Sequence, residues 1–454
     1  MKLDDLYTAM PVWAQNLMVT AYGAKLYYER YFNGDAEFLD FLLKNQTRSA
    51  DEIHAQQVRS LNDLVAHARN NVPLYRSQKQ EFDIELKGVG DLARLPILQK
   101  ETLRGNSDKL LADGMHPKEV ITLHTSGTTG KSLGIHVDIA SRRKAYAFFS
   151  RYHSWAGLKN SKHNVTLGGR TVVPQSKKGK EFWRYNAVMG NYLFSTYHIS
   201  DANLPYYVDK IRSIAPQFIE SYPSAIYLIA KFMEENSLTG IRPKAVMTSG
   251  ETLFDYQREV VERVLGCRVF DQYGCTEQAL FVSQCEMGSY HVHPEYGVVE
   301  ILDGENRHVE AGQVGRVVCT SFMNRATPLI RYDLGDTAEY GGGRCACGRN
   351  FPILNRICGR MDDYIKTPSG RKVGRLDPIF KCVTSTRLAQ IVQTDLSHIT
   401  INIVPGGTYV DDDGRIIVNE LRKRVGDDVC IDLRIVEEIK TNKNGKFKSV
   451  VSMV

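Results

Sequence analysis

The first half of this 454-residue sequence contains no cysteine, and its nine cysteines begin at Cys267. An odd number of cysteines gathered in the second half is not the pattern of a secreted disulfide framework. No apolar run approaches the length that spans a bilayer, and the acidic start Met1-Lys-Leu-Asp-Asp lacks the regions of a secretory signal. We therefore expect a cytoplasmic protein with no membrane span, whose thiols are buried or bound to metal.

Strong charge of either sign is also missing, because the net charge is only +6. This value does not call for nucleic acid as a partner, and a substrate with phosphates or carboxylates suits it equally well. The sequence has no internal repeat and no low-complexity segment. Its 43% hydrophobic and 24% charged residues are typical of a globular protein, and its length predicts two or three domains.

The stretch LHTSGTTGK, residues 123–131, is the most informative part of the chain. Two glycines allow the backbone to approach a ligand closely, and hydroxyls and a lysine can bind phosphate oxygens. The alternative is a solvated loop. A Walker loop is disfavoured, because Thr125 stands where its first glycine is required. The expected phosphate-binding residues are Thr125, Ser126, Gly127, Thr128, Thr129, Gly130 and Lys131.

Helical and strand patterns alternate from residue 141 to 270, which predicts an α/β layered fold. Residues 51–70 form an expected amphipathic helix, with Val58, Leu61, Val65 and Ala68 along one face. Short β-type runs follow from about 285 to 358 and predict a β-rich subdomain. We expect a large N-terminal domain over 1–360 and a small mobile α+β domain over 361–454.

Two short motifs follow predicted strands, at the edge where open α/β sheets bind ligands. In the first motif, Ser249, Gly250 and Glu251 stand between a strand and a helix, although Ser249 would serve equally as a helix cap. In the second, Tyr273 would stack on a flat base and Glu277 would help to hold Mg²⁺. The alternative places Tyr273 in the core and Glu277 on the surface.

Three further motifs lie towards the C-terminus. Asp336, in PLIRYDLGD, is expected to bond ribose hydroxyls, although Asp333 and Asp336 would also suit a turn. Arg360 lies in CGRMDDYIK, which is otherwise an ordinary charged linker. Lys446, in the polar segment TNKNGKFK, would reach a carboxylate and an α-phosphate, but basic terminal segments are commonly only solvated.

Taken together, these motifs resemble the adenylate-forming superfamily, which activates carboxylic acids with ATP. LHTSGTTGK, SGE, YGCTE, IRYDLGD, GRMDDYIK and NGKF occur in the family's order, from about residue 95 to the C-terminus. PLIRYDLGD with CxCGR before GRMDD is similar to the branch of phenylacetate–CoA ligases, coenzyme F390 synthetases and CapK-type proteins. The resemblance implies the family fold, a large domain followed by a small mobile one.

The resemblance also implies a role for each motif. Residues 125–131 would bind the β- and γ-phosphates of ATP, and Ser249, Gly250, Glu251, Tyr273 and Gly274 would frame the adenine. Thr276 and Glu277 would bind the α-phosphate and Mg²⁺, and Asp336 and Arg360 would hold the ribose. Asp362 would be the hinge of the small domain, and Lys446 the catalytic lysine of adenylation.

The function expected from this resemblance is AMP-forming ligation of an organic acid, with CoA as the leading acceptor. One alternative is a CapK-like ligase of surface polysaccharide synthesis that joins the acid to an amine or sugar. Another transfers AMP itself, as F390 synthetase does, and a third retains the fold and nucleotide binding without turnover. Residues 183–198 and 220–224, which contain Arg184, predict a polar or anionic acid, or a saccharide-linked acceptor, more than a long fatty acid. A homodimer is a further expectation.

The cysteine pattern predicts a second site. Cys345-Ala-Cys347 follows three glycines, and Cys285 and His291 lie six residues apart. Three thiolates and one imidazole are a typical ligand set for structural Zn²⁺. His293 would be able to replace His291, and the alternative is a group of buried, unligated thiols.

Overall fold

The computed structural model describes residues 7–32, 36–116, 118–124, 133–158, 164–174, 179–360, 365–370, 372–373, 376, 379, 383, 385–442 and 445–454. It separates into two compact units. Unit 1 contains residues 1–21, 160–269 and 359–454, and unit 2 contains residues 22–159 and 270–358. The expected phosphate-binding residues 125–131 and the expected hinge residue Asp362 lie outside the described residues.

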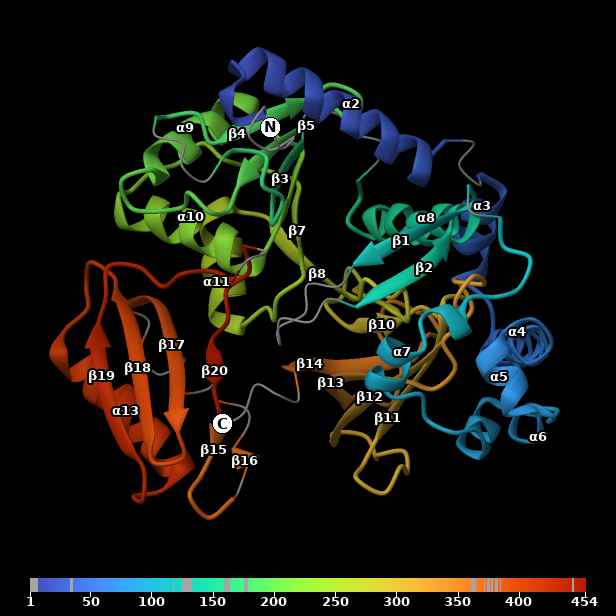
Figure 1. Cartoon of the computed structure of the whole chain (residues 1–454). Helices are drawn as coiled ribbons and strands as arrows, with labels where there is room; N and C mark the ends of the chain where they lie inside the picture. Colours follow the sequence, from blue (N-terminus) through green and yellow to red (C-terminus); the bar gives the residue numbers. More distant parts are fainter. Residues whose placement is uncertain are drawn as a thin grey trace. The chain divides into compact units, whose positions relative to one another are not determined.

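Unit 1 contains an open sheet in the strand order β7-β6-β3-β5-β4 (Figure 1). The neighbours β7/β6, β6/β3 and β3/β5 are parallel, and β4 closes the edge antiparallel to β5. The strands are β3 (Asn164–Gly168), β4 (Trp183–Asn186), β5 (Asn191–Ser195), β6 (Phe218–Ser221) and β7 (Ala245–Ser249). Parallel pairing brings the carboxyl ends of β3, β5, β6 and β7 to one edge of this sheet.

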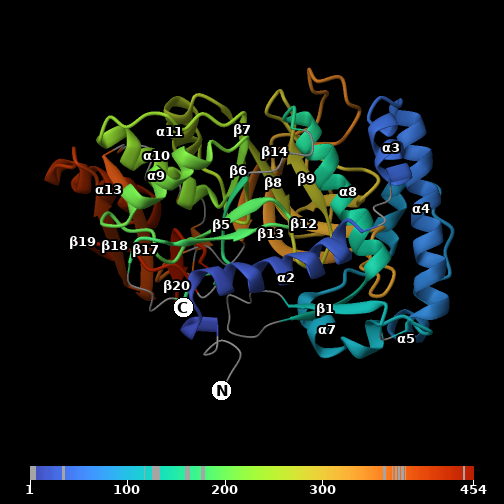
Figure 2. The same cartoon turned by 90° about the horizontal axis from the view of Figure 1, so that it is seen from above.

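Three helices pack together beside this sheet, as Figures 1 and 2 show. They are α9 (Leu204–Ile214), α10 (Pro223–Glu235) and α11 (Asp255–Leu265). Val165, Ile219 and Val246 of the strands are fully buried with Ile229 of α10 and Leu265 of α11. The apolar spacing within the helices accounts for this core, because residues three and four apart share one helix face.

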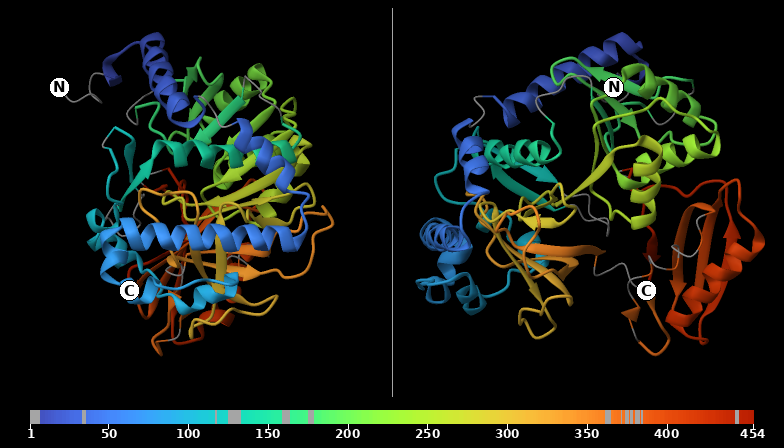
Figure 3. Two further views of the ribbon diagram at one scale, coloured as in Figure 1. Left: turned by 90° about the vertical axis from the view of Figure 1, so that its right-hand side faces the viewer. Right: turned by 180° about the vertical axis from the view of Figure 1, so that it is seen from behind.

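The C-terminal part of unit 1 is a second, four-stranded sheet in the order β19-β18-β17-β20. Its elements are β17 (Thr386–Asp395), β18 (His398–Pro405), α13 (Asp411–Val425), β19 (Cys430–Ile435) and β20 (Val450–Ser452). Ile417, Leu421 and Val425 of α13 pack on Ile399 and Ile401 of β18. Figure 3 shows α13 along one face of this sheet. A two-stranded hairpin, β15 (Ile365–Lys366) and β16 (Lys372–Val373), precedes it.

Helices form much of the N-terminal part of unit 2, and the longest of them is α4 (Figure 3). A capping box starts α4, in which the Ser49 hydroxyl accepts the Glu52 N–H and the Glu52 carboxylate accepts the Ser49 N–H. The elements are α2 (Val12–Arg30, which begins in unit 1), α3 (Ala36–Asn45), α4 (Ala50–Asn71), α5 (Pro73–Ser77), α6 (Lys79–Phe82), η1 (Val89–Arg94), α7 (Lys100–Gly105), η2 (Asp108–Leu110), β1 (Val120–His124), β2 (Gly134–Asp138) and α8 (Ile139–Trp155).

The C-terminal part of unit 2 is a sheet in the order β11-β12-β13-β14-β10-β9-β8. Its described registers are antiparallel, with a bulge in β12 between Arg316 and Val318. The strands are β8 (Arg268–Gly274, which begins in unit 1), β9 (Phe281–Gln284), β10 (Tyr290–Val292), β11 (Gly297–Leu302), β12 (Val314–Ser321), β13 (Tyr332–Tyr340) and β14 (Ile353–Arg360, whose end lies in unit 1).

The mixed α/β class predicted from the sequence is confirmed, including a small C-terminal sheet and helix. The helix expected over 51–70 is α4, and its buried face contains Leu61, Leu64, Val65 and Ala68. Val58 is only partly buried. The domain boundary at residue 360 stays a prediction. Among the helices that the structure describes, none has the length and hydropathy needed to cross a bilayer.

Candidate functional site

The turn after β7 carries the Ser249-Gly250-Glu251 motif. Gly250 has a φ of +82°, a conformation that favours glycine, and a Cβ at this position would stand 3.0 Å from the Tyr222 ring. The N-cap of α11 is Phe254, so Ser249 does not cap that helix and the capping alternative is wrong. The motif lies at the carboxyl end of a parallel strand, as the sequence predicted.

The segment that contains Lys446 lies at this same sheet edge. Asn442 closes a tight turn, because its side chain accepts the Lys446 N–H at 3.0 Å and its carbonyl accepts the Gly445 N–H at 2.9 Å. A Cβ on buried Gly445 would lie 2.5 Å from the Thr196 hydroxyl, just beyond β5. The Lys446 ammonium lies 5.7 Å from the centre of the Tyr222 ring, just beyond β6.

Glu251 joins this segment to the turn after β7. Its carboxylate accepts the Phe447 N–H at 2.6 Å and the Ser224 N–H at 3.1 Å, near the start of α10. Burial raises the pKa of the Glu251 carboxyl, while the Ser224 side chain, the Ser224 and Phe447 N–H groups and the Lys446 charge act in the lowering direction. Both carboxylate oxygens therefore already bind the protein's own backbone. The predicted role of Glu251 in framing adenine stays a prediction.

Arg360 ends β14, within unit 1, and is half-buried. The preceding Gly359 has a φ of +89°, and a Cβ there would stand 3.2 Å from the hydroxyl of Thr252, which directly follows the Ser249-Gly250-Glu251 turn. The chain therefore passes close to that turn just before Arg360.

In unit 2, the structure brings two of the predicted nucleotide-binding residues together. The Tyr273 hydroxyl, near the end of β8, donates to the Asp336 carboxylate of β13 at 2.7 Å. Burial and the nearby Asp336 charge hold the pKa of Tyr273 well above its usual value. Asp333 and Asp336 both lie inside β13, so a simple turn does not describe them. Arg316 pairs with Asp333 at 2.7 Å.

Glu277 and Thr276 lie in the turn after β8. The Glu277 side chain is buried, so the alternative of a surface charge is wrong, whereas Thr276 is exposed. The Lys100 ammonium lies 3.3 Å from Glu277 Oε1, and the Tyr332 hydroxyl donates to the same oxygen at 3.2 Å. Sequence reasoning missed both partners. Lys100, at the start of α7, offered no signal beyond a basic residue in a short helix.

A backbone bridge explains how Lys100 reaches a site far away in sequence. Leu98 donates its N–H to the Arg331 carbonyl at 2.9 Å and accepts the Asp333 N–H at 3.0 Å. The Arg331 guanidinium donates to Glu300 at 2.9 and 3.1 Å and to the Leu95 carbonyl at 2.7 Å. The segment before α7 is thus fixed along the start of β13. Arg331 itself has a φ of +47°, which is rare for a non-glycine residue.

The four residues predicted to bind zinc lie together in unit 2. The donor atoms of Cys285, His291, Cys345 and Cys347 are all within 4.8 Å of one another. The sulfurs of Cys285 and Cys345 are 3.7 Å apart, and Cys347 Sγ lies 3.2 Å from His291 Nε2. A tetrahedral zinc with Zn–S bonds of about 2.3 Å requires sulfurs about 3.8 Å apart.

The surroundings of this cluster also suit a metal. Burial lowers the pKa of His291 to about 4, so at neutral pH the ring is the uncharged form that ligates metals. His293, the alternative ligand, is used elsewhere. Its Nδ1 lies 2.5 Å from Arg151 Nη2, and its Nε2 lies 2.8 Å from the Ser283 hydroxyl. His293 therefore belongs to the buried network of Arg151 and Glu295 and not to the cysteine cluster.

A second group of metal-binding side chains was not expected from the sequence. His398 of β18 and Cys430 and Asp432 of β19 offer donors within 4.8 Å of one another. Parallel pairing sets His398 opposite Cys430, which brings these side chains to one face of the C-terminal sheet. His398 and Asp432 already interact at 2.9 Å, and both are well exposed to solvent.

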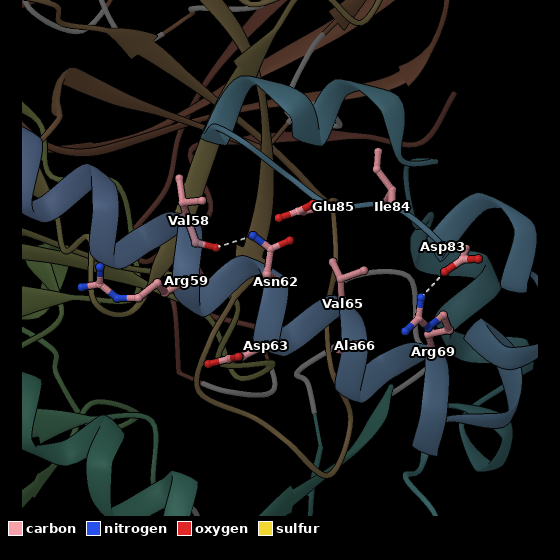
Figure 4. Close-up of a pocket in the computed structure, with 10 residues that line it drawn as sticks. All are labelled: Val58, Arg59, Asn62, Asp63, Val65, Ala66, Arg69, Asp83, Ile84 and Glu85. Atoms are coloured by element: carbon pink, nitrogen blue, oxygen red, sulfur yellow. Dashed lines mark hydrogen bonds and ion pairs between the residues drawn. The ribbon is translucent and has the colours of Figure 1, made fainter.

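Two observations limit where a substrate pocket lies. Arg184, expected among the acid-pocket residues, is fully buried, and its guanidinium donates to Gln15 at 2.6 Å and to the Trp183 carbonyl. It therefore supports the fold of unit 1 and is not a substrate contact. An open pocket beside α4, shown in Figure 4, contains no motif residue; its lining includes Val58, Arg59, Asn62, Asp63, Arg69 and Asp83.

Comparisons with known proteins agree with this architecture. Residues 365–453 match the family model described as the CapK C-terminal domain. Protein CapK of Staphylococcus aureus is 26% identical over 463 residues, which cover 100% of each chain. Phenylacetate-coenzyme A ligase of Pseudomonas putida is 26% identical over 370 residues and covers 74% of this chain and 76% of its own.

Among solved structures, a 2-hydroxyisobutyryl-CoA ligase in complex with its acyl-AMP superposes with a TM-score of 0.70. The two sequences are 18% identical, and the match covers 90% of this chain and 91% of that one. At this identity the likeness concerns the fold. Together the comparisons confirm the resemblance to adenylate-forming enzymes, and to the branch of CapK and the phenylacetate–CoA ligases.

Proposed function

We propose that this chain, with its adenylate-forming fold, is an ATP-dependent carboxylate ligase. It would join an organic acid to AMP with release of pyrophosphate, and then transfer the acyl group to an acceptor. One observation supports this proposal most strongly. The Lys446 segment, the weakest motif in the sequence, lies against the carboxyl ends of the parallel strands, beside the Ser249-Gly250-Glu251 turn. This edge is where open α/β sheets bind ligands.

The chemistry requires stabilisation of negative charge. An acid carboxylate approaches the anionic α-phosphate of ATP, so both reactants repel each other until cations and N–H groups neutralise them. Lys446 supplies a positive charge for this step. Residues 125–131 would bind the β- and γ-phosphates, as the resemblance implies, and would hold pyrophosphate as it leaves.

The remaining nucleotide contacts follow from the resemblance. Asp336 and Arg360 would hold the ribose hydroxyls. Tyr273 would face the adenine while its hydroxyl orients Asp336. Glu277 would hold Mg²⁺, which binds proteins through one or two carboxylates together with nucleotide phosphates. When bound, Mg²⁺ would neutralise phosphate charge. Thr276 is exposed next to Glu277 and would bond the α-phosphate.

CoA is the first acceptor that we propose, because phenylacetate–CoA ligases are among the relatives of this chain. A second candidate is an amine or a sugar, and a specific observation favours it. The match to CapK extends over the whole chain, and residues 365–453 match the CapK C-terminal domain, whereas the phenylacetate ligase match covers 74% of the chain. Supplying an identified acid with CoA or with amines and amino sugars separates the two acceptors.

We also propose that the cluster of Cys285, His291, Cys345 and Cys347 binds a structural Zn²⁺. Four ligands and no open position are typical of a structural zinc, in contrast to catalytic sites, which keep a position free. The cysteines that the structure describes form no disulfide, which suits a reducing cytoplasm. The homodimer expected from the sequence is tested by light scattering of the purified chain.

Carboxylate-dependent exchange of labelled pyrophosphate into ATP tests the main proposal. With a broad panel of acids, the wild-type chain should catalyse exchange with at least one acid, and Lys446→Ala should abolish it. Mass spectrometry of the complete reaction shows whether AMP is released or stays on the product, which distinguishes ligation from AMP transfer. If ATP binds but no acid supports exchange or AMP formation, the chain is a nucleotide-binding protein without turnover.

A further inference from the structure

Glu251 connects three separate segments of unit 1 through one carboxylate. The residue itself lies in the turn after β7, Ser224 lies in the first turn of α10, and Phe447 directly follows Lys446. Both accepted N–H groups belong to the backbone, and the Ser224 side chain adds a further hydrogen bond to the carboxylate. Bonds from N–H groups to an ionised carboxylate are stronger than those between neutral groups.

The segment with Lys446 is carried by the C-terminal sheet. Gln390 donates to the Lys448 carbonyl at 2.8 Å, the Ile391 N–H donates to the Ser449 carbonyl at 2.8 Å, and Val450 then pairs with β17 as part of β20. Phe447 therefore stands between the sheet that carries the lysine and the sheet edge at which the lysine lies. Glu251 is the contact that joins them at this point.

Glycine makes this close approach possible on the other side of Lys446. Gly445 has a φ of +67°, and its missing Cβ leaves room for the Thr196 hydroxyl and for the Gly169 backbone, 2.5 and 3.4 Å from where a Cβ would lie. The residues before and after Lys446 are thus both fixed to the edge of the parallel sheet. The Lys446 ammonium lies near Tyr222 and Gly250.

We propose that Glu251 is a positioning residue that fastens the Lys446 segment to the edge of the parallel sheet for adenylation. This inference rests on the proposed function. Glu251 itself need not touch the reacting atoms. Its removal would release Phe447 and misplace Lys446, and a misplacement of about 1 Å in a reacting group costs roughly a hundredfold in rate. The second half-reaction, which starts from a finished acyl-AMP, would not need this contact.

Hydrogen exchange of the Phe447 amide in the full chain tests the contact without any substrate. Glu251→Ala should raise the Phe447 exchange rate at least about tenfold, since the hydrogen bond that the Phe447 amide donates to Glu251 is lost. Glu251→Gln retains one acceptor oxygen and should give an intermediate rate. Glu259→Ala, which removes an exposed carboxylate of α11, is the matched control and should change nothing. Unchanged Phe447 exchange in Glu251→Ala would overturn the proposal.

The two half-reactions test the role in catalysis. With the acid that supports exchange in the wild type, Glu251→Ala should lower kcat for pyrophosphate exchange about 10- to 100-fold with little change in the KM for ATP. Acyl transfer from synthetic acyl-AMP should stay within about twofold of wild type, because that step does not use the fastened segment. Equal losses in both half-reactions would show a merely structural role.

Gly445→Ala changes the residue that precedes Lys446 and leaves Glu251 unchanged. Its added Cβ meets Thr196, so it should reproduce the selective loss of exchange even if Glu251→Ala folds poorly. If none of the acids supports pyrophosphate exchange by the wild type, the proposed function fails. The hydrogen exchange of the Phe447 amide still decides whether Glu251 fastens the segment. If the wild type exchanges and both variants exchange at the wild-type rate, only the positioning role fails.

Discussion

Removal of the proposed zinc should lower the stability of unit 2. The cluster joins the chain just after β9, where Cys285 lies, to the loop before β14, where Cys345 and Cys347 lie. Cys285 and Cys345 are 60 residues apart in sequence. A metal that holds them together limits the freedom of the unfolded chain as a covalent cross-link would. For a loop of this length the loop-closure relation gives about 4 kcal/mol at 25 °C, as an upper estimate.

For a folding unit of this size, about 4 kcal/mol corresponds to a decrease in Tm of roughly 10 °C. We expect one zinc per chain by mass spectrometry of the metal content, and loss of this zinc in Cys347→Ser. Differential scanning calorimetry should then show the lower Tm in Cys347→Ser and in wild type treated with a chelator, with recovery only in wild type when zinc is added back. Cys347→Ser retains the size of the side chain, so packing changes little.

Cys267→Ser is the matched control, because Cys267 is a half-buried thiol of unit 1, outside the cluster. It should retain the metal. A wild-type chain that stays free of metal after expression with zinc, and has the same Tm as Cys347→Ser, would refute the reasoning. In that case the four side chains are neighbouring thiols and an imidazole, which was the alternative that the sequence left open.

Three further predictions concern the nucleotide site and the small sheet. Tyr273→Phe removes the hydroxyl that orients Asp336 and should raise the KM for ATP roughly three- to tenfold in pyrophosphate exchange. An unchanged KM would mean that ATP binding does not depend on the orientation of Asp336 by Tyr273. Burial raises the pKa of Glu251, which faces Lys446 and Tyr222. Pyrophosphate exchange should therefore fall as the pH decreases through this raised pKa, and Glu251→Gln should lack that decrease. Folding stability should not fall in the same pH range, because the folded state binds this proton more readily than the unfolded state does. Leu421→Ala removes most of a fully buried side chain of α13 and should lower the free energy of unfolding of the C-terminal sheet by about 2–5 kcal/mol, measured by urea denaturation of the full chain. A decrease below about 1 kcal/mol would contradict the packing described.

Local patterns were sufficient to predict many of the elements. The helix at α4 follows from apolar residues at helical spacing. The turn after β7 was also predicted, although the sequence left a helix cap at Ser249 as an equal alternative. These features depend on residues within one element, so the sequence alone contains the necessary information.

Contacts between distant segments were not predictable in this way. Lys100 reaches Glu277 because the backbone of Leu98 bridges to that of β13, and backbone bonds have no signature in side-chain patterns. Arg184 was misread for the same reason. A basic residue beside an expected substrate region suggests an anionic ligand, but its partner is Gln15, which the chain brings from an N-terminal helix. The argument from Arg184 for a polar or anionic acid therefore loses its basis.

The Lys446 segment shows why weak motifs can become informative once the chain is folded. A lysine in a polar segment near a C-terminus is ordinary in sequence. In the structure, Gly250 and Gly445 both adopt left-handed backbone angles, and each has a neighbour within about 3 Å of where its Cβ would stand. The segment with Lys446 thus approaches Thr196, almost 250 residues earlier in the sequence, more closely than a side chain at Gly445 would allow, and Glu251 accepts the Phe447 N–H. An incidental surface contact has no reason to require glycine at the point of approach. The requirement is explained if the contact delivers Lys446 to a defined position, and this is why substitution of either the carboxylate or the glycine should affect the same half-reaction.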